Sequence, residues 1–259
     1  VMWLGERMTD KGIGNGISML IMIGIIARLP QAITQEFIVK MNENGAGGPI
    51  MFLLEVVIFV VVIGFAVLLV QGTRKIPVQY AKRVIGNKQY GGVRQYLPLK
   101  VNAAGVMPII FAQAIMMVPV MFTLGSNNPG GFIRALIDTG GFWHNFILAL
   151  FIIAFTYFYT AITFNHNQIA DEMKRNNGFI PGVKPGKQTA EYIDMIMSRI
   201  VLPGSIFLAI IAILPAFARL FGITTGFSQF FGGTSLLILV GVVLDTLQQI
   251  ESHLLMRHY

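Results

Sequence analysis

The sequence predicts an all-α polytopic membrane protein with six transmembrane helices, each of about 20 mostly apolar residues. Of its 259 residues, 54% are hydrophobic and only 12% are charged, whereas soluble proteins are about 25% charged. Long apolar segments recur along the chain and alternate with polar loops. The chain has no cysteine, which excludes disulfide scaffolds, thiol catalysis and cysteine-based metal sites.

The first apolar segment, residues 17–29, follows the glycine-rich stretch GIGNGIS (residues 12–18). A nucleotide-binding GxGxxG fingerprint needs a strand before it and an amphipathic helix after it. Here Ile17 stands where the third glycine should fall, and the segment that follows is apolar on every face. We therefore interpret GIGNGIS as the entrance to a membrane helix, which reaches spanning length only if residues 13–16 and 30–33 join it.

Five further segments are long and apolar enough to qualify as membrane spans, at residues 51–70, 103–124, 146–164, 200–217 and 232–247. The chain begins with valine and carries no signal-peptide pattern, so we expect it to be an internal fragment of a longer chain. The predicted organisation is the end of a preceding helix and a turn (1–12), membrane helices 13–33, 51–71, 103–124, 144–164, 191–217 and 232–252, loops 34–50, 72–102, 125–143, 165–190 and 218–231, and a tail (253–259).

The orientation follows from the positive charges, because Lys and Arg are enriched in loops on the cytosolic side. Placing residues 5–16 inside puts 72–102, 165–199 and the C-terminus inside as well. Only four of the 19 Lys and Arg residues then fall outside: Arg28, Lys40, Arg134 and Arg219.

Residues 72–104 carry many basic residues and no acidic one. The stretch alternates loosely and turns at Gly86-Asn87, which predicts an extended hairpin. Two interpretations remain open: the charges only set the topology, or they dock an anionic partner such as ribosomal RNA or an acidic protein face. A second loop, residues 165–190, contains the segment GFIPGVKPG, which is predicted to be extended because of its prolines. This segment could serve as a binding site for a partner.

The predicted spans lack the ionisable groups that catalysis or ion coupling inside a membrane requires. Glu55 is near a helix end and is expected to snorkel to the interface. The four histidines fall in loops or at span ends without metal-ligand spacing. We therefore expect no enzymatic activity, no metal and no cofactor. A secondary transporter half is the main alternative function, although no mid-span charge supports it.

Four blocks occur in order between Trp3 and Ile238: WLGERMTDKGIGNGIS, LPLKVNAAGVMPIIFA, FIPGVKPGKQTAEYID and FGGTSLLI. Together they resemble the SecY family, the pore subunits of the bacterial protein-translocation channel. The chain is similar to the C-terminal half of such a protein, from the end of its fourth transmembrane helix to its tenth. The resemblance implies one half of a pseudo-symmetric ten-helix channel, which passes secretory polypeptides and releases membrane segments sideways.

The resemblance also implies roles for individual residues. An apolar constriction ring would include Ile17, Ile21, Ile110 and Ile238, and the lateral gate would include Asn102, Pro108 and Gln113. For any isoleucine taken alone, lipid or helix packing is the simpler role. Docking of the ribosome or of the SecA motor ATPase would use Arg74, Lys75, Lys82, Arg83, Lys88 and Lys184.

The implied partners are the N-terminal half of the same protein, SecE, SecG, SecA, the ribosome, the translocating polypeptide and the lipid bilayer. The implied location is the bacterial inner membrane. In one departure, Lys184 stands where many family members have arginine, which keeps the charge and loses the bidentate geometry.

Overall fold

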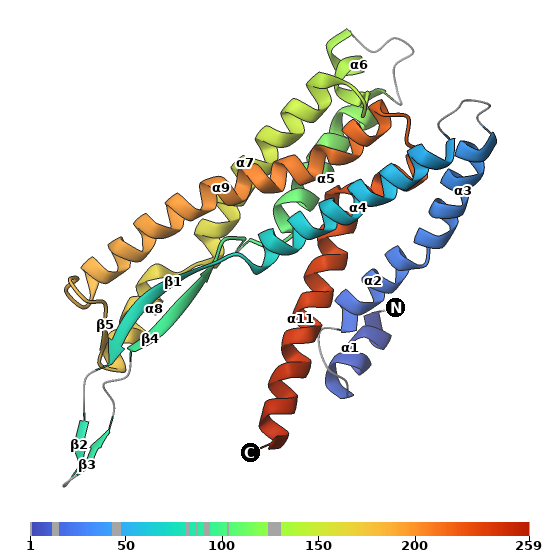
Figure 1. The fold of residues 1–259 in the computed structure, drawn as a ribbon. Helices are drawn as coiled ribbons and strands as arrows, with labels where there is room; N and C mark the ends of the chain where they lie inside the picture. The colour runs from blue at the N-terminus through green and yellow to red at the C-terminus, as the bar shows by residue number, and fades with distance from the viewer. Residues whose placement is uncertain are drawn as a thin grey trace.

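The computed structural model describes residues 2–11, 16–42, 48–80, 83–85, 88–90, 94–102, 104–123 and 131–258. Long helices dominate the fold, and a small β-sheet projects from one end (Figure 1). The helices are α1 (Met2–Lys11), α2 (Gly16–Ile26), α3 (Leu29–Asn42), α4 (Gly48–Gln71), α5 (Met107–Thr123), α6 (Gly131–Ile137), α7 (Phe142–Thr163), α8 (His166–Arg175), α9 (Lys187–Leu220), α10 (Thr225–Ser228), the 3-10 turn η1 (Gln229–Phe231) and α11 (Gly233–His258).

Five stretches of the described chain are helical, long and apolar enough to cross a membrane, so the protein is a multi-pass membrane protein. They are Gly16–Asn42, Gly48–Gln71, Phe142–Arg175, Lys187–Leu220 and Gly233–Ser252. The sixth expected span corresponds to α5, a shorter apolar helix of 17 residues. Pro108 lies in the first turn of α5, where a missing N–H costs no helical hydrogen bond.

Four predicted loops contain helices that the hydropathy pattern did not indicate. The predicted loop 218–231 holds the short α10 and η1. Helix α3 runs to Asn42, into the predicted loop 34–50, because its polar residues Glu36 and Lys40 are buried against partners. Helix α6 lies within the predicted loop 125–143. Helix α8 lies within the predicted loop 165–190, where the side chain of Asn165 accepts a hydrogen bond from the backbone N–H of Gln168 and caps the helix.

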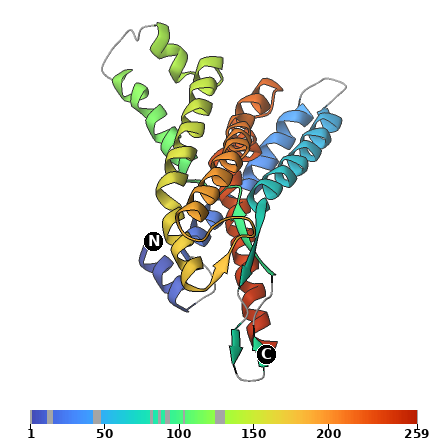
Figure 2. The same ribbon diagram turned by 90° about the vertical axis from the view of Figure 1, so that its left-hand side faces the viewer.

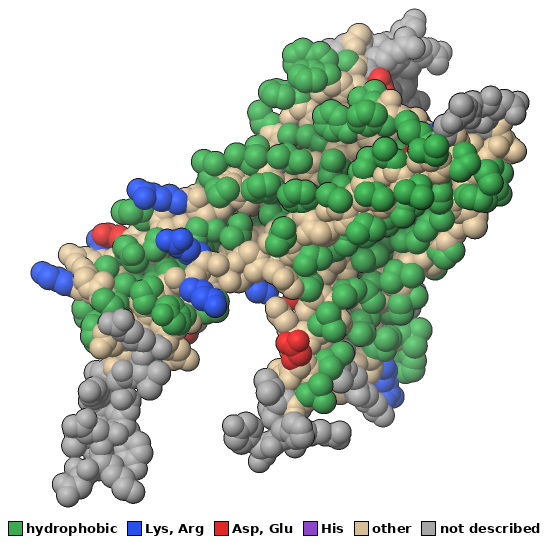
Figure 3. All heavy atoms as spheres, viewed as in Figure 1, with side chains coloured by type: hydrophobic (Ala, Val, Ile, Leu, Met, Phe, Trp, Pro, Cys, Tyr) green, Lys and Arg blue, Asp and Glu red, His purple; other side chains and the backbone are tan. Residues whose placement is uncertain are grey.

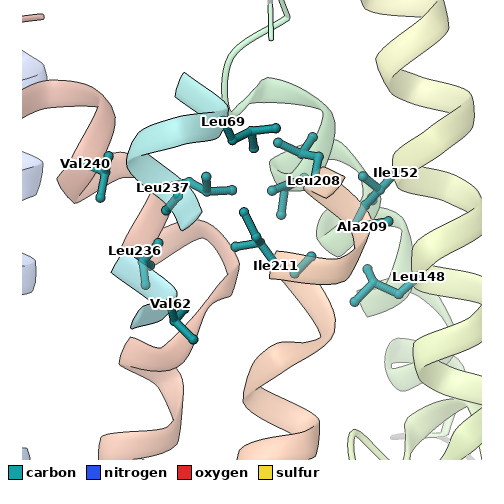
Figure 4. Packing of buried hydrophobic residues seen from close by; sticks show 14 of the residues in the cluster. Val62, Leu69, Leu148, Ile152, Leu208, Ala209, Ile211, Leu236, Leu237 and Val240 are labelled. Atoms are coloured by element: carbon teal, nitrogen blue, oxygen red, sulfur yellow. The ribbon is translucent and has the colours of Figure 1, made fainter. Parts of the chain in front are cut away.

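The main core lies where α4, α5, α7, α9 and α11 meet (Figure 4). Buried residues at its centre include Ile152 of α7, Leu208 of α9 and Leu237 of α11. Small residues such as Ala66 and Ala209 let the helices approach closely. Seen from the side, α9 and α11 stand between an arm made of α5, α6 and α7 and the pair α3 and α4 (Figure 2).

The sheet joins the two long polar loops into one unit. Strand β1 (Thr73–Tyr80) pairs antiparallel with β4 (Arg94–Lys100) on one side and with β5 (Gly178–Phe179) on the other. Beyond it, β2 (Arg83–Ile85) pairs with β3 (Lys88–Tyr90), so the predicted hairpin is confirmed, while its turn at residues 86–87 lies outside the described chain. A second core packs this sheet against α8 and α9 through residues that include Ile76, Val78, Leu99, Met173 and Ile193.

Gly16 is where α2 packs most closely on α1. A Cβ atom added there would lie 2.2 Å from the carbonyl oxygen of Gly5 and 2.6 Å from Cβ of Met8, far inside van der Waals contact. The glycine of the GIGNG motif that the structure describes is therefore required for close packing; the other two, Gly12 and Gly14, lie outside the described residues.

We predict that Gly16→Ala lowers the stability of the protein by about 1–3 kcal/mol, because overpacking forces the two helices apart. Gly24→Ala is the matched control, since nothing lies within 4 Å of a Cβ at Gly24 and alanine favours a helix over glycine by about 1 kcal/mol. Thermal unfolding in detergent micelles measures both. A Gly16→Ala variant as stable as Gly24→Ala would contradict the packing described.

Candidate channel site

Three of the four isoleucines expected in the constriction line one cavity of ≈ 490 Å³. Ile21 comes from α2, Ile110 from α5 and Ile238 from α11, so helices far apart in sequence converge there. Val70, Val106, Met107 and Leu237 add further apolar lining. Branched apolar side chains that surround a cavity in this way exclude water and offer a passing chain no strong binding site.

The same cavity has polar residues on its lining. On α11, Ile238, Val242 and Asp245 all face it, as expected for residues spaced about one helical turn apart on one face. Asp245 therefore lies about 10 Å from Ile238 along the helix axis, toward the C-terminus. Lys100, at the end of β4, and Asn102 line the cavity as well, so it combines charged groups with apolar walls.

A second cavity, of ≈ 570 Å³, shares Ile21 with the first. Its other lining residues come from α2, α3 and the turn between them, α10, η1 and α11, and they include Arg28, Gln31, Gln35 and Gln229. The two cavities therefore share one apolar lining residue, Ile21 of α2.

The remaining expected site residues lie elsewhere. Ile17 is one turn before Ile21 on α2 and is not part of the first cavity's lining; its side chain lies beside Gly5 of α1. Pro108 is fully buried. Gln113 lines a separate cavity of ≈ 280 Å³ between α5, α7, α9 and α11, so the three expected gate residues do not share one surface.

The expectation that Glu55 snorkels to the interface is wrong. Its side chain is buried, and one carboxylate oxygen lies 3.4 Å from Nζ of Lys40. Glu36, one turn before Lys40 on α3, is also buried and accepts hydrogen bonds from the backbone N–H and the hydroxyl of Thr224. Hydropathy missed this cluster, although an acidic and a basic residue at i and i+4 in an apolar helix indicate a possible pair.

Basic side chains gather at the sheet end of the molecule, while apolar side chains cover the helices (Figure 3). Arg74, Lys75 and Lys184, three of the expected docking residues, are exposed there. Because β5 pairs with β1, the second polar loop presents its charges beside those of the first. Lys82 lies outside the described residues, and Arg83 and Lys88 fall in β2 and β3, where only the backbone is described.

Within the described part of the chain, no group of three or more His, Asp or Glu residues is placed to hold a metal ion. The two best-defined candidate sites are the cavity lined by Ile21, Ile110 and Ile238 and the basic surface at the sheet end.

The family model of SecY matches residues 1–247. The chain belongs to the SecY family. It is 45% identical to "Protein translocase subunit SecY" of Streptomyces coelicolor, 42% identical to that of Chlamydia trachomatis and 44% identical to that of Mycobacterium bovis. All of this chain is covered in each comparison, against 59%, 58% and 60% of the relative. The chain thus spans well under two thirds of the length of these SecY relatives.

Two solved structures have the same fold. One, described as "The structure of a protein conducting channel", aligns with a TM-score of 0.67 over 96% of this chain and 61% of its own, at 17% identity. The other concerns the plug domain of the SecY protein and aligns with a TM-score of 0.66 over 96% of this chain and 62% of its own, at 16% identity. These likenesses confirm the predicted fold class of a helical SecY-type channel.

Proposed function

We propose that this SecY chain forms part of a protein-conducting channel, which passes secretory polypeptides across the membrane and releases membrane segments sideways into the bilayer. One observation carries the proposal: Ile21, Ile110 and Ile238 converge on one cavity. Such a ring closes by excluding water and opens without breaking specific contacts. Ile17, one turn earlier on α2, would extend the ring when the channel is complete.

The lateral gate is proposed to include Asn102, Pro108 and Gln113, on the resemblance of their sequence blocks to the SecY family. Asn102 lines the cavity that Ile21, Ile110 and Ile238 share. Pro108 and Gln113 lie on α5, which packs against α7. Pro119 lies inside the same helix, where a proline removes one backbone hydrogen bond and favours bending. The secondary transporter alternative is not favoured, because the curated relatives of the chain are named protein translocase subunits.

The basic sheet end is proposed as the docking surface for SecA or the ribosome, through Arg74, Lys75, Lys82, Arg83, Lys88 and Lys184. Arg74 and Lys75 are exposed on a loop that carries no acidic residue, and unbalanced positive charge of this kind attracts anionic surfaces. This end would face the cytosol of a bacterial inner membrane, together with the C-terminus. SecE, SecG and the N-terminal half of a SecY protein are the other proposed partners, and the energy for transport would come from a partner.

Disulfide crosslinking tests the proposal, because the chain has no native cysteine. The chain would be co-expressed with the part of the Streptomyces coelicolor protein that it does not match. Single cysteines at Ile110 and Ile238 should crosslink to a stalled secretory precursor that carries one cysteine. A cysteine at Val61, which is exposed on α4, should not.

The outcomes distinguish a wrong assignment of the ring residues from a failure of the proposed channel function. If the complex engages the precursor and neither cavity cysteine crosslinks, the ring assignment is wrong. If no precursor is engaged at all, the channel function itself fails. Membranes that contain the co-expressed complex also test the docking surface. Binding of purified SecA or ribosomes to them should weaken as the salt concentration rises, because exposed charges are screened. Binding that does not depend on the salt concentration would contradict the proposed surface.

A further inference from the structure

Three buried charged residues meet where α3, α4 and the end of α9 come together. Glu36, Lys40 and Glu55 are 0%, 5% and 3% exposed, although they lie in helices long enough to span a membrane. Removing charged groups from water is expensive unless each finds partners with good geometry. Their contacts therefore fix particular neighbours at particular distances, which apolar packing alone does not do.

Lys40 connects three elements. It extends from α3, its Nζ lies 3.4 Å from Oε1 of Glu55 on α4, and the same Nζ donates a hydrogen bond of 3.1 Å to the carbonyl oxygen of Gly222, just after α9. Gly222 has φ of +81°, and a Cβ atom there would lie 3.9 Å from Nζ of Lys40. The left-handed backbone at Gly222 turns its segment back against α3.

Glu36 makes a second connection one turn earlier on α3. Its Oε2 accepts a hydrogen bond of 2.9 Å from the backbone N–H of Thr224 and another from the Thr224 hydroxyl. Thr224 directly precedes α10. Glu36 and Lys40 thus hold one short segment, residues 222–224, at two points.

The connected segments continue into the two walls of the ≈ 570 Å³ cavity. On α3, Gln31, Ala32 and Gln35 line it; after Thr224, Gly226, Gln229 and Phe230 line it. The walls are close at this end, since a Cβ at Gly226 would lie 3.6 Å from Oε1 of Gln35. An apolar cluster that includes Phe227 and Phe231 supports the same junction.

We propose that Glu36, Lys40 and Glu55 form a charge clamp that sets the width of this cavity by fixing α3 to the segment that begins α10. The three are positioning residues: they line neither of the two cavities that share Ile21 and act through the walls that they join. Their importance for passage of a polypeptide rests on the proposed function, whereas the geometry does not. The clamp also holds the outer half of the span whose other half, α2, carries Ile21.

The charges give the three residues unequal roles. Two carboxylates and one ammonium sum formally to one negative charge. Lys40→Met leaves two carboxylates without their cation and removes both the α4 and the Gly222 contacts. Glu55→Gln leaves Lys40 balanced by Glu36 and able to reach Gly222. The clamp therefore depends on Lys40 far more than on Glu55.

The test measures the distance between the two walls by double electron–electron resonance, with spin labels on cysteines at Gln31 and Gln229 in the co-expressed complex. Lys40→Met should shift the distance distribution to longer and broader values, and Glu55→Gln should leave it close to that of the parent. Thr224→Val is a milder variant that removes the hydroxyl contact to Glu36 while keeping the backbone N–H, and it should broaden the distribution too. Lys187→Met, at the exposed start of α9, is the control for loss of a cation.

Parent-like distances in both Lys40→Met and Thr224→Val would overturn the clamp, since the apolar cluster would then hold the walls alone. If Lys40→Met fails to fold, Thr224→Val decides: broadening supports the clamp and parent-like distances reject it. Glu55→Gln broadening as much as Lys40→Met would also reject it, because the α3–α4 pair rather than the Gly222 contact would be responsible. Crosslinking at Ile238 reports on the proposed function independently of these distances.

Discussion

Ile238→Asn should make the assembled channel leak ions in its resting state. Ile238 lies on α11 and lines the ≈ 490 Å³ cavity together with Ile21 and Ile110. Exchanging one apolar side chain for an amide removes roughly 2 kcal/mol of favourable burial from the closed arrangement and lets water enter a constriction that closes by dewetting. Because 1.4 kcal/mol is a factor of ten in an equilibrium constant, we expect resting conductance to rise on the order of tenfold or more.

Planar-bilayer recordings of the co-expressed complex measure this effect. Val61→Asn is the matched control: it introduces the same amide on α4, at a position exposed outside the helix cluster, and should leave conductance unchanged. Secretion of a precursor with a weakened signal sequence should improve in Ile238→Asn for the same reason. A tight Ile238→Asn channel, or one that leaks no more than Val61→Asn, would remove Ile238 from the seal.

Much of the fold followed from the sequence because membrane spans obey one strong constraint. A lipid-exposed backbone must satisfy its own hydrogen bonds, so apolar length alone indicates a helix such as α4. The hairpin was predictable for a local reason too, since alternation and a Gly-Asn turn indicate paired strands. The pairing of β5 with β1 was not, because it joins segments about a hundred residues apart and depends on packing against α8 and α9.

In the candidate site, too, some residues were predictable from the sequence and others were not. The positions of Ile21, Ile110 and Ile238 relative to the four SecY-like sequence blocks predicted that they belong to the ring, and the structure brings them to one cavity. Hydropathy could not indicate that α3 continues through Glu36 and Lys40, because a window average treats a buried charge pair as a loop. The error about Glu55 has the same cause: its partner lies on another helix, and only tertiary structure shows that Lys40 reaches it.

Lys40→Met should destabilise the protein by about 3–5 kcal/mol, the usual cost of removing one partner from a buried ion pair. The variant leaves Glu36 and Glu55 buried without the ammonium that lies 3.4 Å from Oε1 of Glu55, and it deprives the Gly222 carbonyl of a donor. Glu55→Gln should cost less, since Lys40 keeps Glu36 as a formal counter-charge one helical turn away. Equilibrium unfolding in mixed micelles measures both.

The double variant Lys40→Met/Glu55→Gln separates the charge effect from lost packing. It returns the cluster to the single formal negative charge of the parent, so it should be more stable than Lys40→Met alone, although it carries one substitution more. Residues in direct contact typically show coupling of about 0.5–3 kcal/mol in such a cycle. Strictly additive losses would mean that the two side chains act independently, and the buried Lys40–Glu55 pair would then add no charge interaction to stability.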